Sequence, residues 1–286
     1  MTAQCPLTSE RLRAAFATLP AFPRAVQDVL DLLRKPNIEL AQLARAIEAD
    51  AALTMRVLRT ANSPFYGSRA GIATVRNACR VLGVHALRNV AIAMLALQQF
   101  PADAPSGLPR RELWRHCTAV AAAARFLAQR LGRDADMAYT AGLLHDIGRM
   151  ALDACFPDAY AQVLARRNSG SISLYDAELA VFGMDHAAVA AELTRVWQLP
   201  EAIIAAVGAH HPEYAGSPDA YGDVVHLADI VCKALRLGSS GELAVVTDEA
   251  QVLQRLGVTC DAVDAWIPEI NVQIQAALAE LGSTLA

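Results

Sequence analysis

The sequence predicts an all-α fold, a helical bundle of two packed halves, and three observations lead to that prediction. Apolar residues recur through nearly the whole chain with the spacing of amphipathic helices. Hydrophobic residues make up 54% of the 286 residues and aromatic residues only 6%, a composition typical of closely packed, alanine-rich helices. No stretch alternates β-branched and polar residues beside a hairpin turn. This apolar content also excludes a mainly disordered chain.

Helices can be placed in order through the N-terminal part of the chain. Pro23 is expected to open a helix, Thr74 to cap another, and Gly83 to end the helix that Thr74 starts. The apolar faces expected in this part are, helix by helix, Val26, Val29, Leu30 and Leu33; Leu40, Leu43, Ala44 and Ile47; Val75, Ala78 and Leu82; and Leu87, Val90, Met94 and Leu97.

The segment FPADAPSGLPRR, residues 100–111, is predicted to divide the chain, because its three prolines and glycine are typical of a linker. We therefore expect an N-terminal helical half over residues 1–108, a second helical half over 109–240 and a C-terminal extension over 241–286. The helices expected after this linker span residues 112–131, 134–155, 173–182, 185–198, 200–210 and 224–235, with two more from Thr247 onward.

Charge and cysteine usage restrict the function classes. Lys and Arg total 25 against 29 Asp and Glu, a net charge of −4, so no basic excess exists for direct binding to nucleic acid. The six cysteines form no C-x-x-C pair, which indicates reduced thiols in the cytoplasm. The N-terminus has no signal-peptide core, and the apolar stretch at residues 90–97 is far shorter than the ~20 residues of a membrane span. We expect a cytoplasmic protein that does not enter a membrane.

Histidines and aspartates from separate expected helices are the candidates for chemistry. Side chains from several helices can meet in a bundle core, which is how helical metal sites are built. Imidazole nitrogens combined with carboxylate oxygens suit iron, manganese, nickel or zinc. Glu112 lies on the same helix face as His116 and could join the site, or it could be a solvated first-turn acid. The candidate ligands are His116, His145, Asp146, His186, His210, His211 and Asp229.

The order of these residues resembles the HD superfamily of metal-dependent phosphohydrolases, with AGLLHDIGRM at residues 141–150 as the central motif. Several segments make the chain similar, more narrowly, to the HDOD family, the HD-related output domain of bacterial signalling proteins. These segments are LPAFPRAV (19–26), IEADAALTMRVLRTANSPFYG (47–67), TVRNACRVLGVHALRNVAIAM (74–94), FGMDHAAVAAELTRVWQLPEAIIAAVGAHH (182–211) and VVHLAD (224–229).

The resemblance implies an HD-like helical C-terminal half and a ligand set for divalent transition metals, either one ion or two. By similarity to binuclear HD proteins, one metal would be held by His116, His145, Asp146 and Asp229. Asp146 would then bridge to a second metal, held by His186, His210 and His211. Where HD-GYP relatives have a lysine in HDIGK, this chain has Arg149, which can bind an anion but is a poor proton donor. The GYP loop of those relatives is also missing.

Three functions remain open at this stage. The first is a non-enzymatic signalling module that binds a partner protein or a nucleotide-like ligand, with Arg149 available for an anion. The second is a metal-dependent phosphohydrolase acting on a nucleotide or cyclic dinucleotide, with Asp146 essential for catalysis. In the third, the metal is structural or sensory and links helices that would otherwise bury uncompensated His and Asp groups. The resemblance favours the first, without an enzymatic activity.

Overall fold

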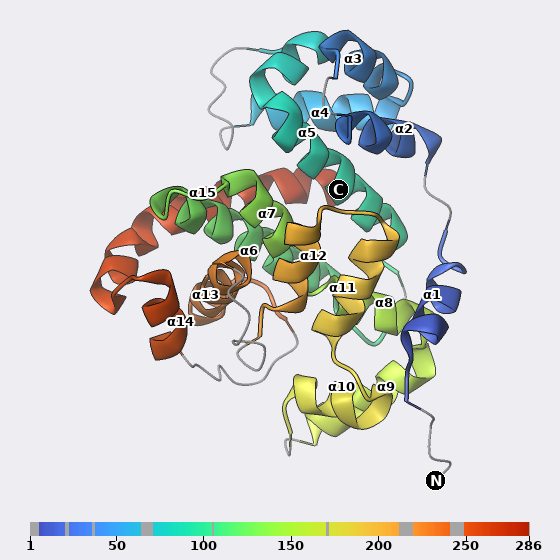
Figure 1. Cartoon of the computed structure of the whole chain (residues 1–286), viewed down its shortest axis with the longest axis vertical. Coiled ribbons are helices and arrows are strands. Elements are labelled where there is room, and N and C mark those ends of the chain that lie inside the picture. The colour runs from blue at the N-terminus through green and yellow to red at the C-terminus, as the bar shows by residue number, and fades with distance from the viewer. Residues whose placement is uncertain are drawn as a thin grey trace. The chain divides into compact units, whose positions relative to one another are not determined.

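The computed structural model describes residues 6–20, 23–35, 38–63, 71–104, 106–169, 172–211, 220–240 and 249–285 (Figure 1). Within these ranges the secondary structure is helical and includes no β-strand, which confirms the predicted all-α fold class. The segments ANSPFYG beyond Ser63 and most of the loop after His211 lie outside the described residues, as does Thr247.

The helices form two compact units that differ from the expected halves. Unit 1 comprises residues 1–19 and 100–271, and unit 2 comprises residues 20–99 and 272–286. One boundary falls between Gln99 and Phe100, where the proline-rich segment begins. The N-terminal helix α1 (Ser9–Phe16) belongs to unit 1 because it packs against α11 and α8, and the last part of the C-terminal helix belongs to unit 2. The expected halves were continuous stretches of sequence, so the prediction could not place the N-terminal helix in unit 1 or the end of the C-terminal helix in unit 2.

Unit 2 is built from the helices expected in the N-terminal part of the chain. Val26, Val29, Leu30 and Leu33 are all buried, as the periodicity predicts. Gly83 adopts a positive φ of 72° and interrupts a long helix, in agreement with its predicted role as a stop. The helices are α2 (Arg24–Leu33), α3 (Leu40–Glu48), α4 (Ala51–Asn62), α5 (Val75–Gln99) and the last residues of α15 (Cys260–Leu285).

Helix α5 is long and apolar enough to cross a membrane by length and composition, with a mean hydropathy of 1.5 over its most apolar window. The sequence had not indicated so long an apolar segment, because the break at Gly83 divides it into two shorter periodic runs. More than half of that window is buried inside the fold, as expected for a core helix. The helix is therefore only weak support for a membrane span.

Unit 1 is centred on α6, an alanine-rich helix that packs against α7 and α13 (Figure 1). Gly142 makes the close approach of α7 possible, since a Cβ at this position would lie 2.9 Å from the backbone of Ala121. The remaining helices of unit 1 are α6 (Arg110–Arg130), α7 (Ala135–Leu144), α8 (Ile147–Cys155), α9 (Pro157–Asn168), α10 (Leu174–Phe182), α11 (His186–Val196), α12 (Glu201–Gly208), α13 (Ala220–Ala234) and α14 (Glu249–Leu256).

One predicted helix is wrong. The sequence favours a single helix over residues 134–155, but α7 ends at Leu144 and α8 begins at Ile147. The start is as predicted, since the Asp134 carboxylate accepts hydrogen bonds from two backbone N–H groups of the first turn. The break falls on His145 and Asp146, and Asp146 has φ −96° and ψ 8°, outside the helical range. Apolar periodicity continues through this turn, so it gave no signal of the break.

Candidate metal centre

Unit 1 brings seven of the predicted ligands together from five places in the chain. His116 comes from α6, the pair His145–Asp146 from the turn between α7 and α8, and His186 from the first position of α11. His210 and His211 follow α12, and Asp229 lies on α13. All of these side chains are buried except that of His211, which is partly exposed.

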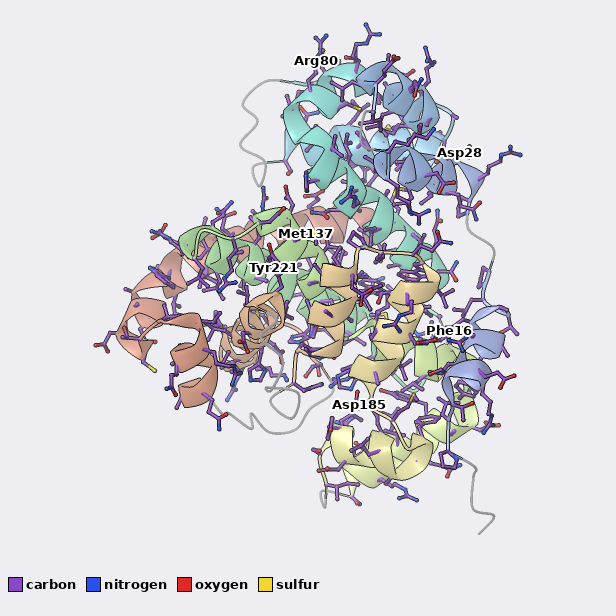
Figure 2. All side chains as sticks on the ribbon, in the orientation of Figure 1. Phe16, Asp28, Arg80, Met137, Asp185 and Tyr221 are labelled. Carbon is purple, nitrogen blue, oxygen red and sulfur yellow. The ribbon has the colours of Figure 1, made fainter. Side chains whose placement is uncertain are left out.

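Local sequence explains why these positions face one centre. Asp185, labelled in Figure 2, caps α11 by accepting a hydrogen bond from Ala188 N–H, which fixes the position of His186 at the helix start. Gly148 lets α8 pass directly against that start, since a Cβ at Gly148 would lie 2.0 Å from the His186 carbonyl oxygen. The break before α8 frees two adjacent side chains from the ~100° separation that a continuous helix would impose.

Asp146 is the carboxylate shared by three histidines of the cluster. Its Oδ2 lies 3.4 Å from His145 Nε2, and its Oδ1 lies 3.1 Å from His186 Nε2 and 4.0 Å from His210 Nε2. A separate pair lies beside it, with His116 Nε2 at 2.9 Å from Asp229 Oδ1. Asp229 uses its other oxygen, Oδ2, to bind Lys233 Nζ at 2.7 Å.

Backbone carbonyls determine which imidazole nitrogen carries the proton. Nδ1 of His145 lies 2.8 Å from the Gly142 carbonyl oxygen, and Nδ1 of His210 lies 2.6 Å from that of Val207. A carbonyl can only accept a hydrogen bond, so both Nδ1 atoms carry hydrogen, and Nε2 is the nitrogen of each ring that can offer a lone pair. Orienting the ring through its outer nitrogen is the usual preparation of a histidine for a metal.

Five ligand atoms in this cluster are buried and have no hydrogen-bond partner. Such atoms are rare in folded proteins, because each costs about 1–3 kcal/mol when it is left unpaired. Two of these atoms, His116 Nε2 and Asp229 Oδ1, face each other at 2.9 Å, the distance of an ion pair. The five atoms are His116 Nε2, His145 Nε2, His210 Nε2, Asp146 Oδ2 and Asp229 Oδ1.

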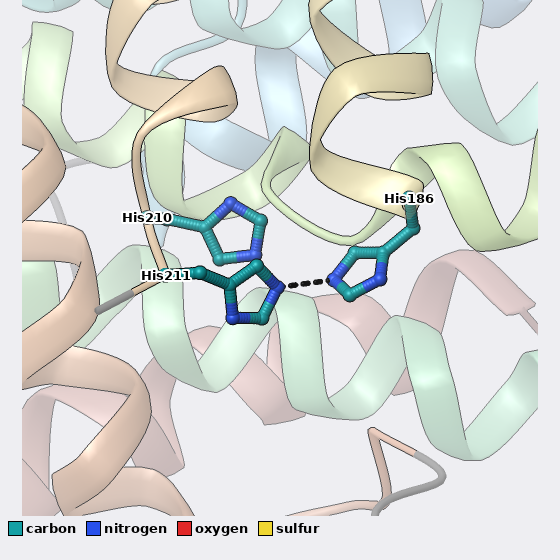
Figure 3. A group of neighbouring side chains, drawn as sticks. All are labelled: His186, His210 and His211. Carbon is teal, nitrogen blue, oxygen red and sulfur yellow. Dashed lines mark hydrogen bonds between the residues drawn. The ribbon is translucent and has the colours of Figure 1, made fainter. Parts of the chain in front are cut away.

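The remaining two histidines are different, because their ring nitrogens have close polar neighbours. His211 Nε2 lies 2.7 Å from His186 Nε2, and Figure 3 shows the two rings joined by this hydrogen bond, with His210 beside them. Arg149 Nη2 lies 3.2 Å from the same His186 Nε2. The Arg149 side chain also approaches Asp146 Oδ1 at 3.3 Å and donates to the Ser240 carbonyl.

Glu178, on α10, is a part of the site that sequence analysis missed. Its Oε2 accepts hydrogen bonds from the backbone N–H and from Nδ1 of His186, at 2.9 and 2.6 Å. Its Oε1 lies 3.9 Å from Arg149 Nε, and the carboxylate is fully buried. The one available signal was an acid on the apolar face of a predicted helix. His226, on α13, places its Nδ1 2.9 Å from the His210 carbonyl oxygen and so supports the chain there.

Burial and neighbouring charges shift the pKa values of the cluster in opposite directions. Burial raises the pKa of Asp146, but the cationic Arg149 and the nearby His145 outweigh it and hold that pKa well below its usual range. Burial likewise opposes Lys233 and His116 at Asp229, whose pKa is also well below its usual range. Burial, reinforced by neighbouring histidines, lowers the pKa values of His210 and His211. The two aspartates are thus charged and these two imidazoles neutral at pH 7.

Glu112 is the candidate ligand that the structure does not bring to the cluster. It lies on α6 one turn before His116, but its side chain is half exposed and its carboxylate lies 3.6 Å from Arg115 Nε. Its place on the helix agrees with the alternative reading as a solvated acid in the first turn. The described groups of potential metal ligands are His116, His145 and Asp146, and His186, His210 and His211.

Comparison with known proteins identifies a family over most of the chain. The HDOD domain model matches residues 19–213. A curated protein of Treponema pallidum (strain Nichols), described only as uncharacterized, is 23% identical over 195 residues. That alignment covers 68% of this chain but only 37% of the relative, so the chain spans about a third of the length of the curated relative it matches.

Solved structures share the fold over nearly the whole chain. An HDOD domain protein of unknown function from Geobacter sulfurreducens is 28% identical, has a TM-score of 0.75, and the match covers 94% of this chain and 98% of that one. A candidate signal transduction protein from Marinobacter aquaeolei VT8 is 24% identical, with a TM-score of 0.75 and coverage of 97% and 61%. A candidate phosphohydrolase from Shewanella amazonensis SB2B is 23% identical, with a TM-score of 0.77 and coverage of 96% and 98%. The last two likenesses concern the fold alone.

Proposed function

Because the chain belongs to the HDOD family, we propose that it is a non-enzymatic regulatory module whose HD-type cluster binds a divalent transition metal. In this proposal the module transmits a signal by binding a partner protein or a nucleotide-like ligand. The family match and the absence of the HD-GYP lysine and loop support the regulatory part. The metal part depends on the chemistry of the cluster itself.

The observation that carries the metal proposal is the group of five buried ligand atoms without a hydrogen-bond partner. An ion would satisfy several of them at once, with His116, His145, Asp146 and Asp229 as its ligands. Two ligand atoms of one such ion stand about 3 Å apart, because each lies ~2.0–2.2 Å from it. The pairs His116 Nε2–Asp229 Oδ1 and His145 Nε2–Asp146 Oδ2, at 2.9 and 3.4 Å, fit that spacing. Iron, manganese, nickel and zinc all accept this mixed set of nitrogen and oxygen ligands.

The chain's own residues supply the rest of the site. The carbonyls of Gly142 and Val207 orient the imidazoles of His145 and His210. Lys233 holds Asp229 in its ionised form, which is the form that binds a cation. In this role the metal links three elements that are remote in sequence, namely α6, α13 and the turn between α7 and α8. Such a link makes the stability of unit 1 depend on the ion.

The complete ligand set favours a second candidate, a metal-dependent phosphohydrolase acting on a nucleotide or cyclic dinucleotide. A bound metal would supply Lewis acidity and an activated water for such a reaction. The residue at the position of the HD-GYP lysine argues against it, since Arg149 is held in buried contacts and a guanidinium is a poor proton donor at neutral pH. We therefore place binding before catalysis.

Metal analysis of the purified chain, combined with thermal unfolding before and after chelation, tests the proposal. We expect bound transition metal and a melting temperature that falls by at least about 5 °C on chelation, since a tightly bound ligand stabilises the folded state. The loaded protein should leave a panel of nucleotides and cyclic dinucleotides intact. Absence of metal with no effect of chelation contradicts the metal site, and metal-dependent turnover that Asp146→Ala abolishes establishes the phosphohydrolase instead.

A further inference from the structure

Arg149 contacts two of the residues that are expected to hold the second ion of a binuclear site. Its guanidinium lies between the shared Asp146 and His186, with Nε 3.3 Å from Asp146 Oδ1 and Nη2 3.2 Å from His186 Nε2. The side chain is only 1% exposed. The Ser240 carbonyl and the Glu178 carboxylate, 3.9 Å away, hold it from the other side. This cation is thus also anchored by two groups, Ser240 and Glu178, that do not belong to the metal ligand set.

The neighbouring imidazoles are also arranged for each other and not for an ion. His186 Nε2 and His211 Nε2 are 2.7 Å apart, a hydrogen-bond distance and shorter than the ~3 Å between two ligands of one ion. His186 is fixed from behind by two hydrogen bonds to Glu178, so it has little freedom to turn away. Among His186, His210 and His211, only His210 has an unpartnered ring nitrogen, Nε2, and the five unpartnered ligand atoms include none from His186 or His211.

The charges of the cluster point the same way. Arg149 already places a buried positive charge between Asp146 and His186, and Lys233 places another beside Asp229. A second ion held by His186, His210 and His211 would add two more positive charges next to the Arg149 guanidinium. Burying like charges so close together is costly, so the second ion is strongly disfavoured while Arg149 is present.

We propose that the Arg149 guanidinium replaces the second metal, so that the cluster binds a single divalent ion and His186, His210 and His211 do not form an ion site in the native chain. This inference rests on the proposed function, because it presumes an ion at His116, His145, Asp146 and Asp229. It assigns Arg149 a positioning role: its fixed positive charge holds Asp146 and His186 in place where a binuclear relative would use a metal.

The test is a titration of the chelator-treated full chain with Mn²⁺. Calorimetry measures how many ions bind, and electron paramagnetic resonance shows whether the bound ions are isolated or coupled. The variant Arg149→Gln removes the charge with little loss of volume, and Arg149→Met is a second variant should the first fail to fold. Arg110→Gln is the matched control, because Arg110 is another buried arginine of unit 1 that pairs with Asp153, outside the cluster. Circular dichroism verifies that each variant is folded.

We expect the native chain and Arg110→Gln to saturate at about one ion per chain, with the spectrum of an isolated Mn²⁺, and the Arg149 variants at about two, with the spectrum of a coupled pair. A native chain that binds two ions overturns the inference but leaves the proposed metal site standing. A folded Arg149 variant that still binds one ion also overturns it. A native chain that binds none contradicts the proposed function and this inference with it. If neither variant folds, the native stoichiometry alone decides.

Discussion

The two sides of the histidine cluster contain the same kinds of ligand, yet they differ in what those ligands contact. On one side, His116, His145 and Asp229 present buried atoms that have no hydrogen-bond partner. On the other, His186 and His211 bond each other, and Arg149 lies against His186. Residues that can bind a metal are therefore not sufficient to form a metal site. The charge already buried among them decides how many ions the residues can accept.

Asp146 belongs to both sides, so its substitution should have the largest effect. Asp146→Asn removes the charge that approaches His145 and His186, and we expect Mn²⁺ affinity to fall by more than the ~10–100-fold typical of outer-shell changes. Calorimetric titration of the purified variant measures this loss. Asp153→Asn is the matched control, since it changes a buried acid that pairs with Arg110 away from the cluster. Retention of native affinity in Asp146→Asn would mean that the ion binds elsewhere.

Gly148→Ala should break the packing that sets the spacing between the two sides. The added Cβ would meet the His186 carbonyl oxygen at 2.0 Å and the Ala190 nitrogen at 2.9 Å, and backbone atoms cannot move aside as a side chain can. We expect the free energy of unfolding to fall by about 3 kcal/mol, at the upper end for an overpacked core. Denaturant unfolding measures this loss. Gly282→Ala is the control, because a Cβ added at Gly282 would meet no neighbouring atom within 4 Å. Equal stability of the two variants would contradict the close approach of α8 and α11.

Glu178→Gln should separate the two sides, with a smaller effect. It weakens the bonds that hold His186 and removes a charge near Arg149, so we expect about 2 kcal/mol of lost stability. Mn²⁺ affinity should change by less than ~10-fold, because His186 is not a ligand of the single ion. Glu192→Gln is the control, an acid on the same helix as His186 that pairs with Arg13 and Arg195. A larger loss of affinity in Glu178→Gln alone would make His186 a ligand and remove the distinction between the sides.

The sequence alone predicts the fold class and the residues of the cluster, but not the contacts among those residues. Apolar periodicity identified the buried face of α2 and, apart from Leu40, which is exposed, that of α3. The order of His and Asp residues indicated the family. The periodicity did not predict the break at His145 and Asp146, because the residues on both sides of this turn are as apolar as the rest of the two helices. Glu112 was a candidate because helical spacing does not show which side of a helix is covered.

Arg149 was expected to be available for an anion, and its placement against Asp146 and His186 depends on tertiary contacts that no local pattern contains. The same reason explains why Glu178 was missed, since its partners lie on other elements of unit 1. Composition and periodicity describe faces of helices. The balance of buried charge among several helices appears only when they are packed together.

Anomalous diffraction from crystals grown with Mn²⁺ shows directly where the ion binds. We expect one strong peak within coordination distance of His116 Nε2, His145 Nε2 and the carboxylates of Asp146 and Asp229, and continuous density for the Arg149 guanidinium beside His186. A peak between His186, His210 and His211, or no peak in the cluster, would contradict a single ion held in this way.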